Sequence, residues 1–192
     1  MREQPLEEIL HTFREEYLTF LRQTIDAARR GHPDLVTELA LRVNGELEHD
    51  RLMLNRIDMV WREHGETQLA NAEFDSITDN DESRASEIGN VQFEGITVRW
   101  LSFRWHTCAV KLTPPPTTWV PIWAWFDDWF DIDDQKPVDI HGLGEVVHSV
   151  SRIEERDGSC QFVVDLGSAP VSTVVELLRA CRNAGAHTVM LG

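Results

Sequence analysis

Residues 160–191, CQFVVDLGSAPVSTVVELLRACRNAGAHTVML, contain the pattern that decides the fold. The first part, residues 160–166, is rich in apolar and β-branched side chains and predicts a strand. Residues 169–184 carry apolar side chains at helical spacing, and Gly185 is of a type that commonly terminates a helix. Residues 187–191 predict a second strand. We therefore expect a strand–helix–strand unit here.

A second group of elements precedes this unit. Apolar and polar side chains alternate in three segments, which we interpret as strands: residues 96–103, 105–112 and 143–153. The dipeptide Asp157–Gly158 favours a hairpin turn between the last of these and the strand at residues 160–166. Residues 117–131, TTWVPIWAWFDDWFD, place aromatic side chains on one helical face and predict a helix with Thr118 as its N-cap.

From residue 105 onward, the predicted order is strand, helix, strand, strand, helix, strand. This is the order of elements in the ferredoxin-like, or split βαβ, antiparallel sheet. Residues 96–103 precede that pattern and are expected to add an extra edge strand. The fold class predicted for this part of the chain is therefore α+β.

The N-terminal part of the sequence has a helical period instead. Residues 6–28 repeat apolar side chains at i, i+3 or i+4, and i+7, which predicts an amphipathic helix that ends at Gly31. Residues 33–64 show similar spacing, so a second helix and an αα-hairpin are expected. The predicted domains are a helical hairpin, an acidic linker and an α+β domain, at residues 1–70, 71–94 and 95–192 respectively.

The charge of the chain is strongly negative. Eighteen Lys and Arg residues stand against 33 Asp and Glu residues, which gives a formal net charge of -15 at pH 7. Affinity for nucleic acids and anionic membranes comes largely from Lys and Arg, so we expect neither as a partner. A negative field accelerates association with a basic protein, and it also keeps a protein in solution.

The cysteines and the N-terminal sequence bear on location. Cys108, Cys160 and Cys181 form no C-x-x-C pair, so neither a zinc ribbon nor a disulfide framework is indicated. The first residues lack a cationic segment followed by an apolar run, and no apolar stretch is long enough to span a bilayer. The expected location is the cytoplasm.

No catalytic motif is recognisable. The sequence has no glycine-rich phosphate-binding loop, no H-E-x-x-H and no G-x-S-x-G, so no catalytic residue, metal ligand or cofactor is predicted. A metal-binding alternative comes from three Glu-x-x-His pairs, a spacing that di-iron helical bundles use. These pairs are Glu8 with His11, Glu46 with His49, and Glu145 with His148.

A hydrolase alternative comes from the strands. His106 and Cys108 stand two residues apart on a predicted strand and therefore share a face. His148 and Asp165 fall on neighbouring predicted strands. A Cys–His nucleophile pair is compatible with this placement.

The densest acidic cluster follows the tryptophan-rich helix. It contains Asp127, Asp128, Asp131, Asp133 and Asp134, and Trp125 stands two residues before it. An exposed tryptophan with an acidic rim has the composition of a protein-binding hot spot. We therefore predict these six residues as the partner-binding site; the alternatives are a solvated helix end and a site for a hard cation.

Three segments carry a family resemblance. Residues 146–149 (VVHS), residues 164–170 (VDLGSAP) and the following VVELLRACRNAGAHTVMLG resemble the C-terminal part of uncharacterised small acidic bacterial proteins. Some proteins of that kind are thought to act as immunity or accessory partners of polymorphic toxins. The resemblance implies a binding role and transfers no catalytic residue.

These observations lead to one main hypothesis and two alternatives. The main hypothesis is a non-enzymatic intracellular protein that binds another protein, as an immunity-type inhibitor binds a basic effector. The first alternative is a metal-binding protein or a hydrolase that uses the Asp and His clusters. The second is a homo-oligomeric scaffold joined through the helical hairpin.

Overall fold

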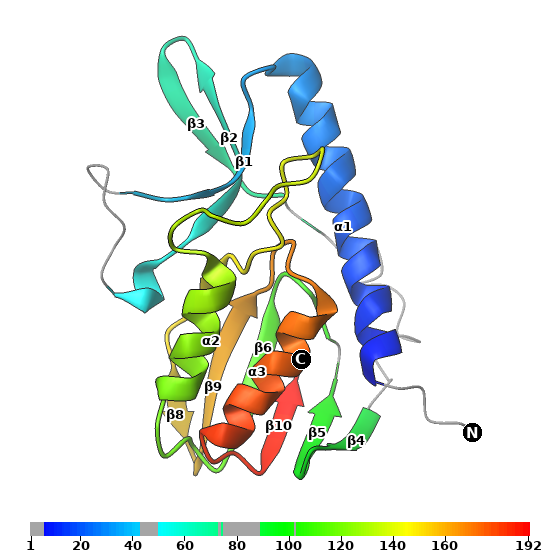
Figure 1. Ribbon diagram of the computed structural model, residues 1–192, viewed down its shortest axis with the longest axis vertical. Coiled ribbons are helices and arrows are strands. Elements are labelled where there is room, and N and C mark those ends of the chain that lie inside the picture. Colours follow the sequence, from blue (N-terminus) through cyan, green and yellow to red (C-terminus); the bar gives the residue numbers. More distant parts are fainter. Residues whose placement is uncertain (1–5, 43–49, 73, 75–88, 102) are drawn as a thin grey trace.

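The protein is an α+β structure with two separate sheets (Figure 1). The computed structural model describes residues 6–42, 50–72, 74, 89–101 and 103–192. One sheet has three strands in the order β1-β2-β3, and the other has seven. The predicted α+β class is confirmed.

The larger sheet has the strand order β4-β5-β10-β6-β9-β7, and β8 also pairs with β9. Neighbouring strands are antiparallel except β5 and β10, which are parallel. The strands, in sheet order with β8 last, are β4 (Gly89–Phe93), β5 (Ile96–Trp100), β10 (Thr188–Leu191), β6 (Cys108–Thr113), β9 (Ser159–Asp165), β7 (Ser149–Val150) and β8 (Glu154–Arg156). The predicted strands at 96–103, 105–112, 160–166 and 187–191 are therefore present, whereas β7 is much shorter than the predicted 143–153.

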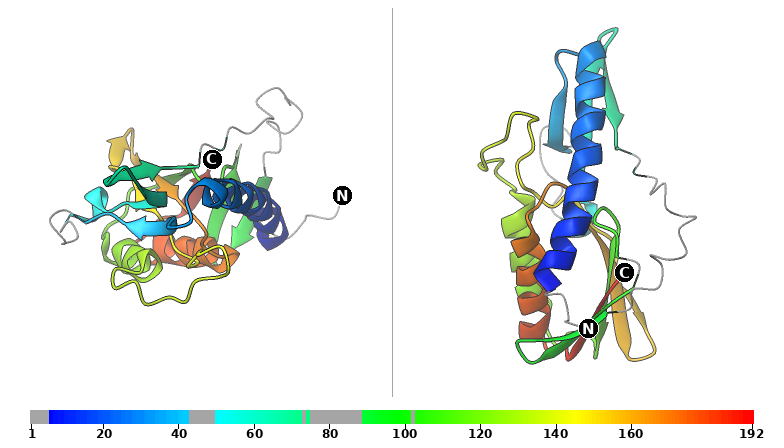
Figure 2. Two further views of the ribbon diagram at one scale, coloured as in Figure 1. Left: turned by 90° about the horizontal axis from the view of Figure 1, so that it is seen from above. Right: turned by 90° about the vertical axis from the view of Figure 1, so that its right-hand side faces the viewer.

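Two helices cover one face of the larger sheet (Figures 1 and 2). They are α2 (Val120–Phe130) and α3 (Val171–Asn183), and both were predicted. The hydroxyl of Thr118 accepts a hydrogen bond from the backbone N–H of Val120, although Trp119 is the N-cap residue. Apolar side chains of both helices and of the sheet are fully buried, among them Ile122, Phe126, Phe130, Phe162, Leu177 and Leu178. Burying a large apolar side chain contributes about 1.5–3 kcal/mol, so this layer is the main source of stability.

The long helix α1 (Leu6–Gly31) runs beside the larger sheet and continues up to the smaller one (Figure 2). It ends at Gly31, as predicted. The rings of Phe13 and Phe103 lie 5.3 Å apart, and those of Tyr17 and His106 lie 5.7 Å apart, so the helix packs on the segment before β6. Within the described part of the chain, none of the helices has the length and apolar character needed to cross a bilayer.

The described residues of the predicted second helix form no α-helix. The described residues of the predicted segment 33–64 form strand β1 (Val36–Ala40), a single 3-10 turn (Arg51–Met53) and strand β2 (Arg56–Glu63), and β3 (Glu66–Ala70) follows. The prediction was wrong because the apolar residues that it placed on one inner helical face are divided between the interior, which holds Leu54 and Ile57, and the surface. Val36 and Leu39 are 51% and 39% exposed, whereas Glu38 is buried. A scaffold joined through a helical hairpin therefore has no structural basis.

The edge of the larger sheet also differs from the prediction. Residues 96–103 were expected to form the edge, but β5 lies between β10 and β4. The edge strand is β4, which falls inside the predicted linker 71–94. The linker residues 73 and 75–88 lie outside the described residues.

Three X-Gly dipeptides form the tight hairpins of both sheets. Both residues of each pair have positive φ: His64–Gly65 at 52° and 87°, Glu94–Gly95 at 45° and 92°, and Asp157–Gly158 at 50° and 71°. Two-residue hairpins favour this left-handed backbone because it matches the twist of the strands. The turn at Asp157–Gly158 is therefore confirmed, and His64–Gly65 is the local signal for the β2–β3 hairpin.

We predict that Gly65→Ala lowers the free energy of unfolding by about 1–2 kcal/mol, because a side chain disfavours the left-handed backbone. The matched control is Gly31→Ala, where the added Cβ meets no atom within 4 Å and φ is not positive. Urea denaturation of both variants measures the difference. Equal stability of Gly65→Ala and Gly31→Ala would contradict a left-handed backbone at Gly65.

Candidate functional site

Three acidic side chains and a histidine meet where the two sheets join. We call Glu38, Asp58, Asp165 and His148 the buried charged cluster. Glu38, Asp58 and His148 are 4%, 4% and 1% exposed, and the Asp165 side chain keeps 32% of its surface exposed. Ionised groups are rarely buried without a compensating partner, so this cluster requires an explanation.

The strand register brings two of the carboxylates together. In the antiparallel pair of β1 and β2, Thr37 faces Met59 and Leu39 faces Ile57, which places Glu38 opposite Asp58. Like charges directly across a strand pair are destabilising. A positive group between them is therefore required to stabilise this arrangement.

His148 supplies that positive group. Its Nε2 lies 2.8 Å from Glu38 Oε1, and its Nδ1 lies 3.1 Å from Asp58 Oδ1 and 3.8 Å from Asp165 Oδ2. Burial alone lowers the pKa of His148, but the carboxylates of Asp165, Asp58 and Glu38 outweigh it and hold that pKa well above its ordinary value. The ring is thus an imidazolium that faces a carboxylate on each side.

Glu38 connects this cluster to more distant backbone. Its Oε2 accepts a hydrogen bond of 2.6 Å from the N–H of Gly144, and its Oε1 accepts one of 3.1 Å from the N–H of Ser168. Its own φ is 49°, a backbone conformation that residues other than glycine rarely adopt. Strain of this kind persists only where surrounding contacts hold it.

Arg56 provides a second buried connection. Its guanidinium donates to the backbone oxygens of Glu38 (2.7 Å), Phe130 (2.8 Å) and Asp131 (2.6 Å), and to the carboxylate of Asp134 (2.7 Å). The side chain is 5% exposed and lies over the Phe130 ring. Arg56 therefore fixes the C-terminal end of α2 against the smaller sheet.

Residues 131–148 connect α2 to β7 without a helix or strand, and we call them the anchored loop. Arg56 holds the start of the loop and Glu38 holds its end at Gly144 and His148. The middle is held by Arg29, which donates to the carbonyl of His141, and by Thr37, which donates to that of Gly142. Loops of this length without secondary structure are commonly functional. Figure 1 shows the loop above α2, between the smaller sheet and α1.

The anchored loop displays apolar side chains to solvent. Ile140 is 90% exposed and Val138 is 65% exposed. Val138 and Leu39 of β1 line the same pocket of about 250 Å³. We call Leu39, Val138, Ile140 and the exposed Asp133 the loop surface.

The structure distributes the predicted acidic residues among different roles. Asp127 makes a bidentate ion pair with Arg51, at 2.7 and 2.6 Å. The carboxylate of Asp131 accepts hydrogen bonds from the backbone of residues 135 and 136, and that of Asp134 pairs with Arg42 and Arg56. Asp128 and Asp133 are exposed. Much of the predicted acidic surface is therefore neutralised within the chain.

Trp125 does not belong to a surface. It is 5% exposed, and its indole N–H donates to the carbonyl of Thr173 at 2.9 Å. The prediction of a tryptophan anchor was wrong because this ring faces α3. Exposed apolar residues in and after the acidic segment include Ile132, Val138 and Ile140, and sequence analysis did not single them out.

The thiol of Cys108 is unsuited to nucleophilic catalysis. It is fully buried, and burial raises its pKa far above the ordinary value, whereas a nucleophile needs the thiolate. His148 and Asp165 do meet, but His148 is engaged by carboxylates on both ring nitrogens. His106 stacks on Tyr17 instead of approaching a nucleophile.

The Glu-x-x-His pairs do not form a metal centre among the described residues. Glu8 and His11 are exposed on α1, the pair at 46 and 49 lies outside the described part, and Glu145 is exposed whereas His148 is buried. No group of three or more His, Cys, Asp or Glu in that part is placed to hold a metal ion. In the buried charged cluster, Glu38 lies at Nε2 of His148 whereas Asp58 and Asp165 lie at Nδ1, so the three carboxylates do not converge on one point.

No protein-family model, curated protein or solved structure matches this chain. The function must therefore be argued from the geometry and chemistry of the chain itself. Sequence reasoning missed Glu38, Arg56 and Asp58, although polar residues inside the apolar run RIDMV were a signal that one strand face buries charge.

We predict that His148→Gln lowers the free energy of unfolding by about 3–5 kcal/mol, because it leaves two buried carboxylates without a cation. The matched control is His141→Gln, which breaks the partly exposed pair with Asp26 and is expected to cost less than about 1 kcal/mol. Chemical denaturation at pH 7 measures both values. Similar losses in the two variants would contradict a central role for His148.

The raised pKa of His148 also predicts how stability depends on pH. The unfolded chain releases the proton near pH 6.5, whereas the folded chain retains it to higher pH. The contribution of charged His148 to the free energy of unfolding is complete below that pH. It declines as pH rises toward the folded-state pKa, by up to about 1.4 kcal/mol per pH unit. Denaturation between about pH 6.5 and 8.5 tests this. His148→Gln should lack the slope, and a wild-type curve parallel to that of the variant would refute it.

Proposed function

We propose that this protein is a non-enzymatic binding protein that recognises a basic protein partner through the loop surface. The observation that carries the proposal is the exposure of Ile140 and Val138, at 90% and 65%, on a loop that buried charged residues hold in place. Exposed apolar groups on a preorganised segment favour association, because little conformational entropy is lost on binding.

Charge argues for a basic partner. The formal net charge is -15, and Asp133 of the loop surface and the nearby Asp128 are exposed. Complementary charge accelerates encounter and excludes partners of the same sign. The same charge opposes nucleic acids and anionic membranes. A basic effector is the partner class that fits this balance, and this protein would then act as its immunity-type inhibitor.

A cytoplasmic location is part of the proposal. All three cysteines are free and buried, which agrees with a reducing compartment. Catalysis is not proposed, because the histidine of the buried charged cluster is 1% exposed and its ring nitrogens face carboxylates.

We also infer that the larger sheet follows the ferredoxin-like plan from β6 onward. The order β10-β6-β9-β7 supports this, since β9 and β10 flank β6 and are connected through α3. The pair β4 and β5 is then an addition at the β10 edge. The fold assignment carries no functional conclusion.

The test is capture of the partner by tagged protein, followed by binding kinetics with the purified partner. We predict that Ile140→Ser weakens binding at least about tenfold, because it removes an apolar anchor. Val120→Ser is the matched control, since Val120 is 72% exposed but lies at the start of α2. Asp133→Asn should lower the association rate at low salt. Equal affinity of the wild type and Ile140→Ser would refute the loop surface as the binding site.

A further inference from the structure

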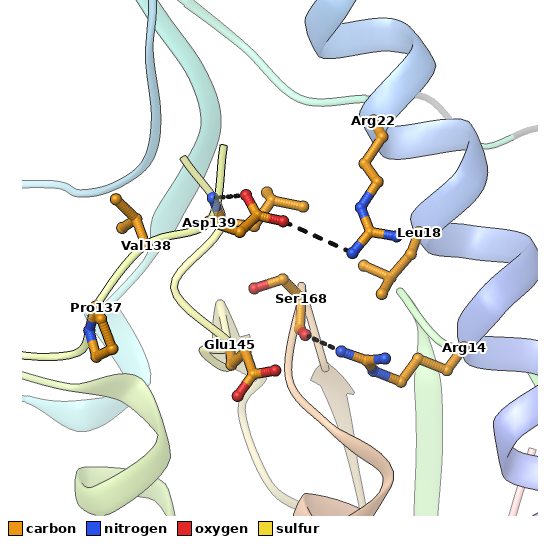
Figure 3. A pocket seen from close by; sticks show the side chains of 9 residues that line it. Arg14, Leu18, Arg22, Pro137, Val138, Asp139, Glu145 and Ser168 are labelled. Carbon is orange, nitrogen blue, oxygen red and sulfur yellow. Dashed lines mark hydrogen bonds and ion pairs between the residues drawn. The ribbon is translucent and has the colours of Figure 1, made fainter. Parts of the chain in front are cut away.

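A pocket of about 360 Å³ lies between α1 and the anchored loop (Figure 3). Side chains of α1 form one wall and side chains of the loop form the opposite wall. Its lining residues are Arg14, Leu18, Arg22, Pro137, Val138, Asp139, Leu143, Glu145 and Ser168. The volume is within the range of small-molecule sites.

The α1 wall is cationic. Arg14 is held rigidly, since its Nε donates to the carbonyl of Ala169 at 2.7 Å and its Nη2 donates to that of Ser168 at 3.1 Å. Arg22 is only loosely engaged, with Nη2 3.6 Å from Asp139 Oδ2. The Nε of Arg22 is buried and has no hydrogen-bond partner. A buried donor without an acceptor is unfavourable. The Arg22 side chain as a whole is 37% exposed, so its guanidinium is accessible to an anionic group.

The loop wall is anionic. The carboxylate of Glu145 makes no hydrogen bond or ion pair with any residue that the structure describes, and the backbone φ of this residue is 55°. Asp139 is already used, because its Oδ1 accepts from the N–H groups of His141 and Leu143. Figure 3 shows the Glu145 carboxylate on the side of the pocket opposite α1. Glu145 is exposed, so its carboxylate is accessible to a cationic group of a ligand.

The remaining lining is apolar apart from Ser168. Leu18 and Leu143 are 1% and 3% exposed, and Pro137 and Val138 lie beside the loop carboxylates. A purely anionic ligand would meet the carboxylates of Asp139 and Glu145, and a purely cationic ligand would meet the two arginines. A ligand that carries both charges and an apolar body avoids both repulsions.

We propose that this pocket binds a small zwitterion, an α-amino acid with an apolar side chain. Its carboxylate lies at the Arg22 guanidinium, which suits carboxylates geometrically, and its ammonium lies at Glu145. The apolar side chain packs on Leu18 and Leu143. Val138 lines this pocket and also belongs to the loop surface. The residues that recognise the two charges of the ligand, Arg22 and Glu145, lie outside the loop surface, so the two proposals can fail separately.

The test is calorimetric titration of the full chain with leucine and with two analogues that each carry one of its charges. These are 3-methylbutylamine and 4-methylpentanoate. We expect leucine to bind and each analogue to bind at least about tenfold more weakly, because each lacks one ion pair. Absence of binding by leucine, isoleucine, valine and methionine up to about 10 mM would overturn the proposal, since such a Kd corresponds to negligible affinity.

Variants assign the binding to this pocket. Glu145→Gln and Arg22→Lys each remove one recognition element and are expected to weaken leucine binding at least about tenfold. Arg30→Gln is the control, because Arg30 is an exposed residue of the same helix outside the pocket. Thermal unfolding without ligand checks that each variant is folded. Leucine binding that survives in both folded variants would refute the assignment.

Discussion

The imidazolium of His148 between Glu38 and Asp58 is the interaction on which the arrangement of the two sheets depends. Strand pairing places the two carboxylates opposite each other, where they repel and are screened from water. His148 lies 110 residues from Glu38 in the sequence, and its imidazolium balances the charges of both Glu38 and Asp58. The smaller sheet is thus attached to the larger one by charge as well as by apolar packing. Breaking such a buried pair costs far more than a surface ion pair.

The same attachment determines the form of the anchored loop. Glu38 binds the loop near its end, and Arg56 of β2 binds its start. Strands β1 and β2 of the smaller sheet therefore support the anchored loop, which contains no strand. This explains how Ile140 can be 90% exposed on an ordered loop. Such preorganisation lowers the entropic cost of binding.

The anchored loop presents different chemistry on its two sides. Toward α1 it contributes Asp139 and Glu145 to a pocket whose other wall contains Arg14 and Arg22. Toward solvent it presents Ile140. Both features depend on the backbone hydrogen bonds that hold the loop, so loss of the buried charged cluster is expected to disturb both. A ligand in the pocket would contact the segment that carries the loop surface, which would provide a route for coupling between the pocket and the proposed partner site.

The elements β6, α2, β9, α3 and β10 follow from local pattern, because their apolar residues face the core and strand and helix periods differ. α1 is recognisable for the same reason. The predicted strand at residues 143–153 does not follow this pattern, because the chain there is mostly loop and only the short β7 pairs with β9. The β1–β2 pair is not recognisable from local pattern, because Glu38, Arg56 and Asp58 point inward and Val36 is exposed. Sequence periods are interpreted on the assumption that apolar residues are buried and charged residues are exposed, and this pair reverses that assumption. Charge, cysteine state and fold class were thus accessible from residue order alone. The buried charged cluster, the anchored loop and the pocket were decided only by tertiary structure, because each joins residues about a hundred positions apart through contacts that no local period encodes.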